Sequence, residues 1–259
     1  MQQYAVNDAD AQSYDLEPAQ TPPELPGSVR VGEDTEDTLD GVAADLFIHS
    51  INCVNEFGDF HLALSHGAIQ ERLLMKLMTD PKYRSIPWSR THLWSVAEPI
   101  VEPGHPDHSM THWSQILVDA GGVPQEQLHS IHAHRPDGAA EYTKELIEHL
   151  EWRERGHDRL DFVLLGDEHG LIRGFDELTD QLVGIAPCQS RVMMSRRLIN
   201  AARFIAIVGT GHAGRDLVDL FEQDHQEIGL SPAGGVLRWY LDGYACRHTQ
   251  DPYINEESP

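Results

Sequence analysis

Asp167, Glu168 and His169 stand next to one another in the chain, and they have the residue types of a general base with orienting acids. A histidine can take a proton from water near neutral pH, and a neighbouring carboxylate can hold the imidazole ring in the required orientation. The alternative is a solvated polar turn, because a chain with 16 histidines places some of them beside acids by chance. We take these three residues as the candidate catalytic group.

Two further segments have residues that could bind an anion. Segment 65–70 reads Ser-His-Gly-Ala-Ile-Gln and precedes a helical pattern, so free backbone N–H groups and the helix dipole would favour an anion near Ser65 and Gly67. Segment 209–215 reads Gly-Thr-Gly-His-Ala-Gly-Arg, in which Gly211 allows close backbone approach and Arg215 adds a fixed positive charge. The sequence therefore predicts an anion site here, although Gly67 could equally be a plain turn residue.

Two other spacings point to a cofactor or metal only superficially. Gly209, Gly211 and Gly214 match the G-x-G-x-x-G spacing of dinucleotide sites, but no second βαβ half follows to hold a nucleotide. His108 and His112 have the H-x-x-x-H spacing, but no glutamate follows His108 and no third ligand is identifiable. We therefore predict no cofactor and no metal, and we expect His105, His132 and His134 to lie on the surface.

The elements that must position these residues follow from short apolar runs that alternate with amphipathic segments. The runs predict buried strands at 61–64, 91–94, 160–165 and 204–208. The amphipathic segments predict helices at 39–51, 68–79, 109–120, 138–154 and 213–223. This order predicts an α/β fold with a doubly wound parallel sheet, Rossmann-like and flanked by helices. Because such sheets bind ligands at the carboxyl ends of their strands, we expect the catalytic and ligand-binding residues in loops 65–70, 95–108, 166–176 and 209–215.

Composition limits the partners and the organisation of the 259-residue chain. There are 42 acids against 19 bases, a net charge of −23, so we expect neither nucleic acid nor a membrane surface as a partner, and an anionic ligand needs local cations. Three distant cysteines without a C-x-x-C spacing and an acidic start without a secretory pattern favour a cytoplasmic protein. We expect an acidic disordered tail over 1–37, one domain over 38–250 and a C-terminal tail over 251–259.

The order of these segments resembles the 6-phosphogluconolactonase family, relatives of the glucosamine-6-phosphate isomerases, from about residue 39 to 247. The scaffold matches are FHLALS at 60–65, PWSRTHLW at 87–94, VPQEQLH at 123–129, LDFVLLG at 160–166, RVMMSRRLINAA at 191–202 and LRWYLD at 237–242. The resemblance implies an isomerase/lactonase type of sheet. It also implies a small-molecule sugar phosphate as ligand and hydrolysis of its lactone in the pentose phosphate pathway.

The site motifs of that family are only partly present. Where members carry SGGSTP, segment 65–70 keeps one serine and one glycine, and where they carry GDER, segment 95–99 keeps only Glu98. The segment around His169 matches GEDGHTASLF with the His-Gly order reversed, which aligns Gly170 with the family's base. The resemblance assigns phosphate binding to Arg191 and Arg215, and Arg173 is a further candidate cation.

Three functions therefore stay open at this stage. One is a divergent lactonase of weak activity that uses the residues named above. Another is a catalytically inactive relative that binds a sugar phosphate or a protein partner. The third is another hydrolase or isomerase chemistry on the same scaffold.

Overall fold

The computed structural model describes residues 22–166, 171–172, 175, 181–186 and 190–246. Among these residues, seven strands form one sheet in which every neighbouring pair is parallel. In spatial order they are β1 (Ser28–Gly32), β10 (Val236–Asp242), β9 (Phe204–Gly209), β6 (Phe162–Leu165), β2 (Phe60–Leu64), β3 (Thr91–Ser95) and β5 (Leu128–His129). The parallel sheet predicted from the sequence is confirmed.

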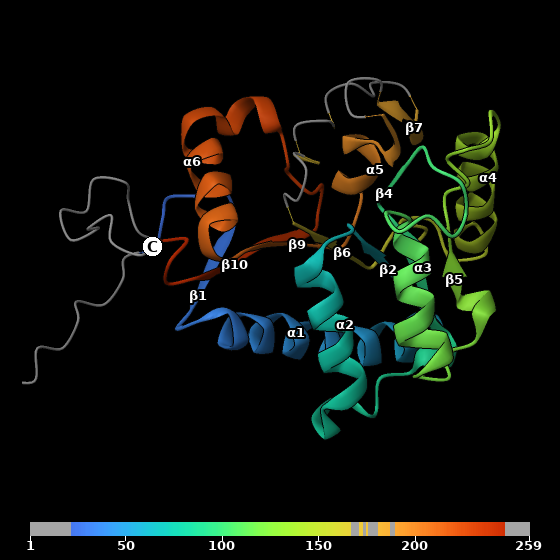
Figure 1. Cartoon of the computed structure of the whole chain (residues 1–259), viewed down its shortest axis with the longest axis horizontal. Helices are drawn as coiled ribbons and strands as arrows, with labels where there is room; N and C mark the ends of the chain where they lie inside the picture. The colour runs from blue at the N-terminus through green and yellow to red at the C-terminus, as the bar shows by residue number, and fades with distance from the viewer. Residues whose placement is uncertain (1–21, 167–170, 173–174, 176–180, 187–189, 247–259) are drawn as a thin grey trace, which may run out of the picture.

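Helices cover both faces of this sheet (Figure 1). They are α1 (Thr35–Phe57), α2 (Ala68–Thr79), α3 (Ser109–Trp113), α4 (Gly138–Leu150), α5 (Arg196–Asn200) and α6 (Gly211–Ile228). Three short 3₁₀ turns span Pro81–Tyr83, Trp88–Arg90 and Gln125–Gln127 in the described chain. A π-helical turn over Ser114–Asp119 extends α3, so the helix predicted at 109–120 is present with a wider last turn.

The alternation of side chains along each strand divides the core between the two faces. In β6, Phe162 and Leu164 pack with the buried residues of α1, α2 and α3, whereas Val163 and Leu165 pack with those of α4, α5 and α6. A strand buried on both faces has no polar positions to alternate, which explains why β6 reads as a continuous apolar run. The sheet is therefore doubly wound, as predicted.

A second, antiparallel sheet lies beside the parallel one. Its strands are β4 (Ala97–Pro99), β8 (Arg191–Met194) and β7 (Val183–Ala186), with β8 in the middle. The pairing sets Pro99 opposite Arg191 and Glu98 opposite Val192. Loop 95–108, expected to be irregular, therefore contains a strand that joins it to the segment of Arg191.

The predicted boundary between tail and domain is wrong for residues 28–37. β1 pairs with β10 at the sheet edge, with Ser28 opposite Arg238, and α1 begins at Thr35, where the Asp34 side chain accepts a hydrogen bond from the N–H of Asp37. The partner of β1 lies more than 200 residues later, so no local pattern could reveal the pairing. Residues 1–21 and 247–259 lie outside the described residues, and the two tails there stay predictions. No described helix is long and apolar enough to cross a membrane.

Candidate functional site

Ser65 lies directly after β2, and its side chain is fully buried. The Ser65 hydroxyl oxygen accepts hydrogen bonds from the N–H of Gly166 at 2.9 Å and from Gln70 Nε2 at 2.8 Å. One hydroxyl thus joins the ends of β2 and β6 to the first turn of α2. The predicted anion loop is therefore held together by its own side chains.

One hollow at this edge of the sheet is small. A hollow of about 40 Å³ is lined by Ile69, Gly166, Val208, Gly209, Thr210, Ala213, Gly214 and Leu217. A methyl group added to Gly166 would lie 2.7 Å from Gln70 Nε2, so the Gln70 side chain already occupies this approach. Segments 65–70, 166 and 209–215 converge here as predicted, but small-molecule sites usually enclose about 300 Å³ or more.

Gly211, the first residue of α6, uses its backbone N–H within the protein. The N–H donates to both carboxylate oxygens of Asp242, at 3.1 and 3.0 Å. The same carboxylate accepts from the N–H of Ala245 at 2.9 Å and from the Thr35 hydroxyl at 3.2 Å. An acid at a helix N-terminus is stabilised by the helix dipole, so Asp242 takes the position that we predicted for a bound anion.

The two candidate arginines lie in different surroundings. Arg215 is 7% exposed, and its guanidinium carbon lies 5.3 Å from the centre of the Tyr244 ring. Arg191 is half-buried at the start of β8, and its Nε has no hydrogen-bond partner among the described residues. Burial lowers the pKa of Arg191 from its ordinary value. A partly desolvated guanidinium with an open donor is suited to bind an anion.

The candidate catalytic residues Asp167, Glu168 and His169, together with Arg173, lie outside the described residues. The neighbouring apolar side chains are described, and Leu171, Ile172 and Phe175 are buried in the core on the α4 face.

Glu98 is a buried carboxyl group that spacing within the sequence did not single out. Its Oε1 accepts from the Ser95 hydroxyl at 2.7 Å, and its Oε2 accepts from the N–H of Ser109 at 3.0 Å. Burial raises the pKa of Glu98 to about 7, although these hydrogen bonds act in the opposite direction. A carboxyl group that titrates near neutral pH can donate or accept a proton. What could have identified Glu98 from the sequence is that it is the one residue of the GDER motif that segment 95–99 keeps.

His108 also lies near this edge, in the residue before α3. It is 6% exposed, and its pKa is lowered by burial and then by the nearby rings of His132, His134 and His66. His105 and His132 are exposed, as expected. His134 is half-buried with a buried Nδ1, so its placement on the surface is corrected. Their spacing along the chain does not reveal this group, because three different loops bring the histidines together.

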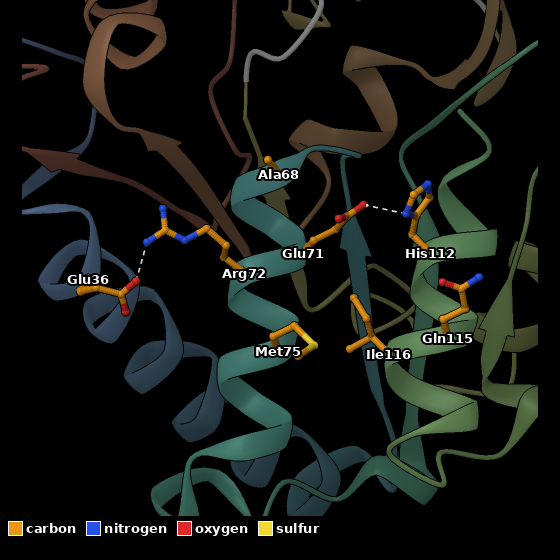
Figure 2. Close-up of a pocket in the computed structure, with 8 residues that line it drawn as sticks. All are labelled: Glu36, Ala68, Glu71, Arg72, Met75, His112, Gln115 and Ile116. Carbon is orange, nitrogen blue, oxygen red and sulfur yellow. Dashed lines mark hydrogen bonds and ion pairs between the residues drawn. The ribbon is translucent and has the colours of Figure 1, made fainter. Parts of the chain in front are cut away.

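A separate hollow of about 580 Å³ lies between α2 and the helical segment of α3 and its π turn (Figure 2). Figure 2 shows Met75 and Ile116 facing it, with Ala68 at one end. Glu71 pairs with His112 at 3.4 Å across this hollow. It lies against the helices rather than at the carboxyl ends of the strands, and of the predicted anion loop only Ala68 borders it.

Comparison with protein families gives a match over most of the chain. The model described as glucosamine-6-phosphate isomerases/6-phosphogluconolactonase matches residues 33–239. The GDH/6PGL endoplasmic bifunctional protein of Homo sapiens is 27% identical over 233 residues, which cover 80% of this chain. This chain spans only 29% of the length of that relative.

A shorter relative matches along most of its own length. The 6-phosphogluconolactonase of Haemophilus influenzae is 24% identical over 203 residues, covering 72% of this chain and 86% of the relative. The crystal structure of 6-phosphogluconolactonase from Thermotoga maritima superposes with a TM-score of 0.67 at 15% identity, covering 83% of this chain and 99% of the other. At that identity the superposition supports the fold alone.

Proposed function

Because the chain belongs to the glucosamine-6-phosphate isomerases/6-phosphogluconolactonase family, we propose that it hydrolyses the lactone of a phosphorylated sugar acid, with low turnover. The observation that carries the proposal is the meeting of segments 65–70, 166 and 209–215 at the carboxyl edge of β2, β6 and β9. This is where parallel α/β sheets bind small ligands. The family relationship supplies the class of substrate.

The reaction needs a base, a water molecule and cations. The base takes a proton from water, the water oxygen bonds to the lactone carbonyl carbon, and the ring C–O bond breaks. The released alkoxide then takes a proton. We assign the base to His169, with Asp167 and Glu168 orienting it, because a histidine is the group in this segment that can accept a proton near neutral pH.

Substrate binding is assigned to the cations and small residues of the same edge. Arg191 Nε has no hydrogen-bond partner among the described residues, and we propose that Arg191 binds the phosphate together with Arg215 and Arg173. We also assign substrate binding to three residues of the loops at this edge, Ser65, Gly67 and Gly211. Because Gly211 donates to Asp242, it can serve a ligand only if that carboxylate shifts.

The same contacts favour a second candidate function, a relative that binds but does not catalyse. The described chain leaves little room for a sugar phosphate next to Gly166. The Asp242 carboxylate lies at the start of α6, the Gln70 side chain lies against Gly166, and the hollow between these segments measures about 40 Å³. The departures from the SGGSTP and GDER motifs point the same way.

The experiment is a coupled assay with 6-phosphogluconolactone in which the spontaneous hydrolysis rate is subtracted. We expect the parent to exceed that background and His169→Ala to lose about 10²–10⁴-fold in kcat/KM, the usual contribution of a positioned base. His105→Ala, which removes an exposed histidine, is the matched control and should retain the parent rate. A parent rate equal to buffer would overturn the hydrolase proposal.

Binding of 6-phosphogluconate, measured by calorimetry, separates the two candidates. If the parent binds without turnover, the second candidate holds, and Arg215→Ala should abolish the affinity. If Arg191→Ala and Arg215→Ala both bind like the parent, the anion site assigned here is wrong.

A further inference from the structure

A group of histidines lies on the α4 face of the sheet, outside the candidate site. His61, His92 and His129 come from the adjacent strands β2, β3 and β5, and His149 comes from α4. The rings of His61 and His92 stack with centroids 4.7 Å apart, and those of His92 and His129 with centroids 5.1 Å apart. The centroid of the His149 ring lies 4.7 Å from that of His129.

Three of these histidines bring their nitrogen atoms to one point. One ring nitrogen from each of His92, His129 and His149 lies within 4.8 Å of the other two. His92 Nδ1 and His129 Nε2 are 2.9 Å apart, so one of them carries a hydrogen and the other a lone pair. Zinc–nitrogen bonds of about 2.0–2.1 Å in a tetrahedron require nitrogen pairs about 3.3 Å apart, so a small outward shift of the His92–His129 pair, with His149 adjusting to it, would admit an ion.

The other nitrogen of two of these rings is already held. His129 Nδ1 lies 2.5 Å from Glu145 Oε1, and His149 Nδ1 lies 2.9 Å from the Glu145 carbonyl oxygen. Both acceptors require Nδ1 to carry the hydrogen, which leaves the lone pair on Nε2. Histidines that ligate metals typically donate their second N–H to a carboxylate or a backbone carbonyl in this way. Glu145 thus sets the tautomer of both rings.

The same hydrogen bonds decide how His92 would bind an ion. Because Glu145 fixes the hydrogen of His129 on Nδ1, His129 Nε2 holds a lone pair and His92 Nδ1 carries the hydrogen between the two rings. His92 therefore becomes a ligand through Nδ1 when its hydrogen moves to Nε2, which leaves the imidazole neutral.

We propose that His92, His129 and His149 form a binding site for a divalent transition metal ion, with Glu145 orienting two of the ligands and water as a fourth. Three imidazoles suit zinc, copper or nickel rather than magnesium or calcium, which prefer oxygen ligands. A bound ion would join α4 to β3 and β5. The neighbouring trio of Asp59, His61 and His92 is the weaker candidate, because Arg153 and His61 already bind the Asp59 carboxylate.

The test is calorimetric titration of the metal-free full chain with zinc chloride, followed by cobalt(II) as a spectroscopic probe. We expect one zinc equivalent with a dissociation constant in the micromolar range or tighter, and cobalt absorption bands typical of a four-coordinate nitrogen site. His149→Gln should weaken zinc binding at least tenfold, and Glu145→Gln should weaken it by about 10–100-fold through the loss of ligand orientation. His105→Gln, at an exposed histidine, is the control and should bind like the parent.

His149 is half-buried on α4, so its replacement is expected to preserve the fold, which circular dichroism can check. If the variant does not fold, the parent still decides the question through the ring ¹⁵N resonances of its histidines. Zinc should shift the resonances of His92, His129 and His149 together. Absence of zinc binding, zinc binding unchanged in both variants, or shifts confined to other histidines would overturn the proposal.

Discussion

At the scale of single residues, Glu98 is a motif residue whose burial reduces stability when its carboxyl group ionises. It is fully buried, with Ser95 and the N–H of Ser109 as hydrogen-bond donors to its two oxygens. Neither donor is a cation, so these hydrogen bonds offset only part of the cost of removing an ionised carboxylate from water. The pKa of about 7 follows from that imbalance.

Glu98→Gln should therefore change the pH dependence of the unfolding free energy. The folded-state pKa is raised from 4.5 to about 7, so the contribution of Glu98 to stability is complete below about pH 4.5 and is lost as pH rises through 7. The glutamine stays neutral and can keep both hydrogen bonds, with its oxygen towards Ser109. Relative to the parent, the variant should gain up to about 3 kcal/mol between pH 5 and pH 8, at about 1.4 kcal/mol per pKa unit.

Urea unfolding at the two pH values measures this difference. Glu126→Gln, at an exposed glutamate, is the matched control and should follow the pH dependence of the parent. If the stability difference between parent and Glu98→Gln is the same at pH 5 and pH 8, Glu98 is ionised at both and the assigned pKa is wrong.

At the scale of elements, one buried arginine connects the end of α4 to the starts of two strands. The side chain of Arg153 is 1% exposed, and its Nη2 pairs with Asp59 at 2.5 Å and with Asp161 at 2.9 Å. Asp161 also accepts from Arg203 Nε at 3.0 Å. Burial alone would raise the pKa of Asp59, but His61 and Arg153 lower it overall, so the Asp59 carboxylate is ionised at neutral pH.

Replacing Arg153 with methionine should destabilise the protein by about 3–5 kcal/mol, because removal of one partner leaves buried carboxylates without compensation. Urea unfolding at pH 7 measures the loss. Arg135→Met is the matched control, since Arg135 is 44% exposed and pairs with the exposed Asp137 and Glu141, so its loss should cost no more than about 1 kcal/mol. Equal losses in the two variants would contradict the role assigned to the network.

Some elements can be predicted from their own sequence pattern, whereas others depend on a distant partner strand or are too short to show a pattern. The α2 segment 68–79 and the central strands β2, β6 and β9 were predictable because their own apolar pattern reports burial. β1 and β5 were not, since β1 is stabilised by β10 at the other end of the chain and β5 is only two residues long.

The candidate site follows the same rule. Convergence of segments 65–70 and 209–215 was predictable from the strand order, because parallel strands place their carboxyl ends at one edge. The bond from Gly211 to Asp242 and the grouping of His92, His129 and His149 were not, since 37 and 20 residues separate the three histidines and no local spacing links them. Side chains that meet only across strands leave no periodic signal.

At the scale of the whole molecule, the net charge of −23 opposes compactness. Like charges on a folded surface repel one another, and folding brings them closer than they are in the unfolded chain. Several of the 19 bases form ion pairs with specific acids in the described chain. Arg153 and Arg203, for example, both pair with Asp161. The remaining acids therefore have few cations to offset them.

Salt should therefore stabilise this protein rather than weaken it. Raising NaCl from about 0.02 M to 0.5 M shortens the Debye length from roughly 20 Å to roughly 4 Å, which screens repulsion between exposed acids. The buried pairs around Arg153 are screened much less, and exposed pairs such as Arg135–Glu141 contribute little that salt could remove. We expect the melting temperature to rise by roughly 2–4 °C, which corresponds to about 1 kcal/mol for a domain of this size.

The increase should be the same in KCl, and smaller in a variant with the exposed residues Glu24, Glu102 and Glu126 changed to glutamine. A melting temperature that falls with salt would mean that attractive surface pairs outweigh the repulsion. An increase of equal size in the neutralised variant would mean that the salt acts through something other than these charges.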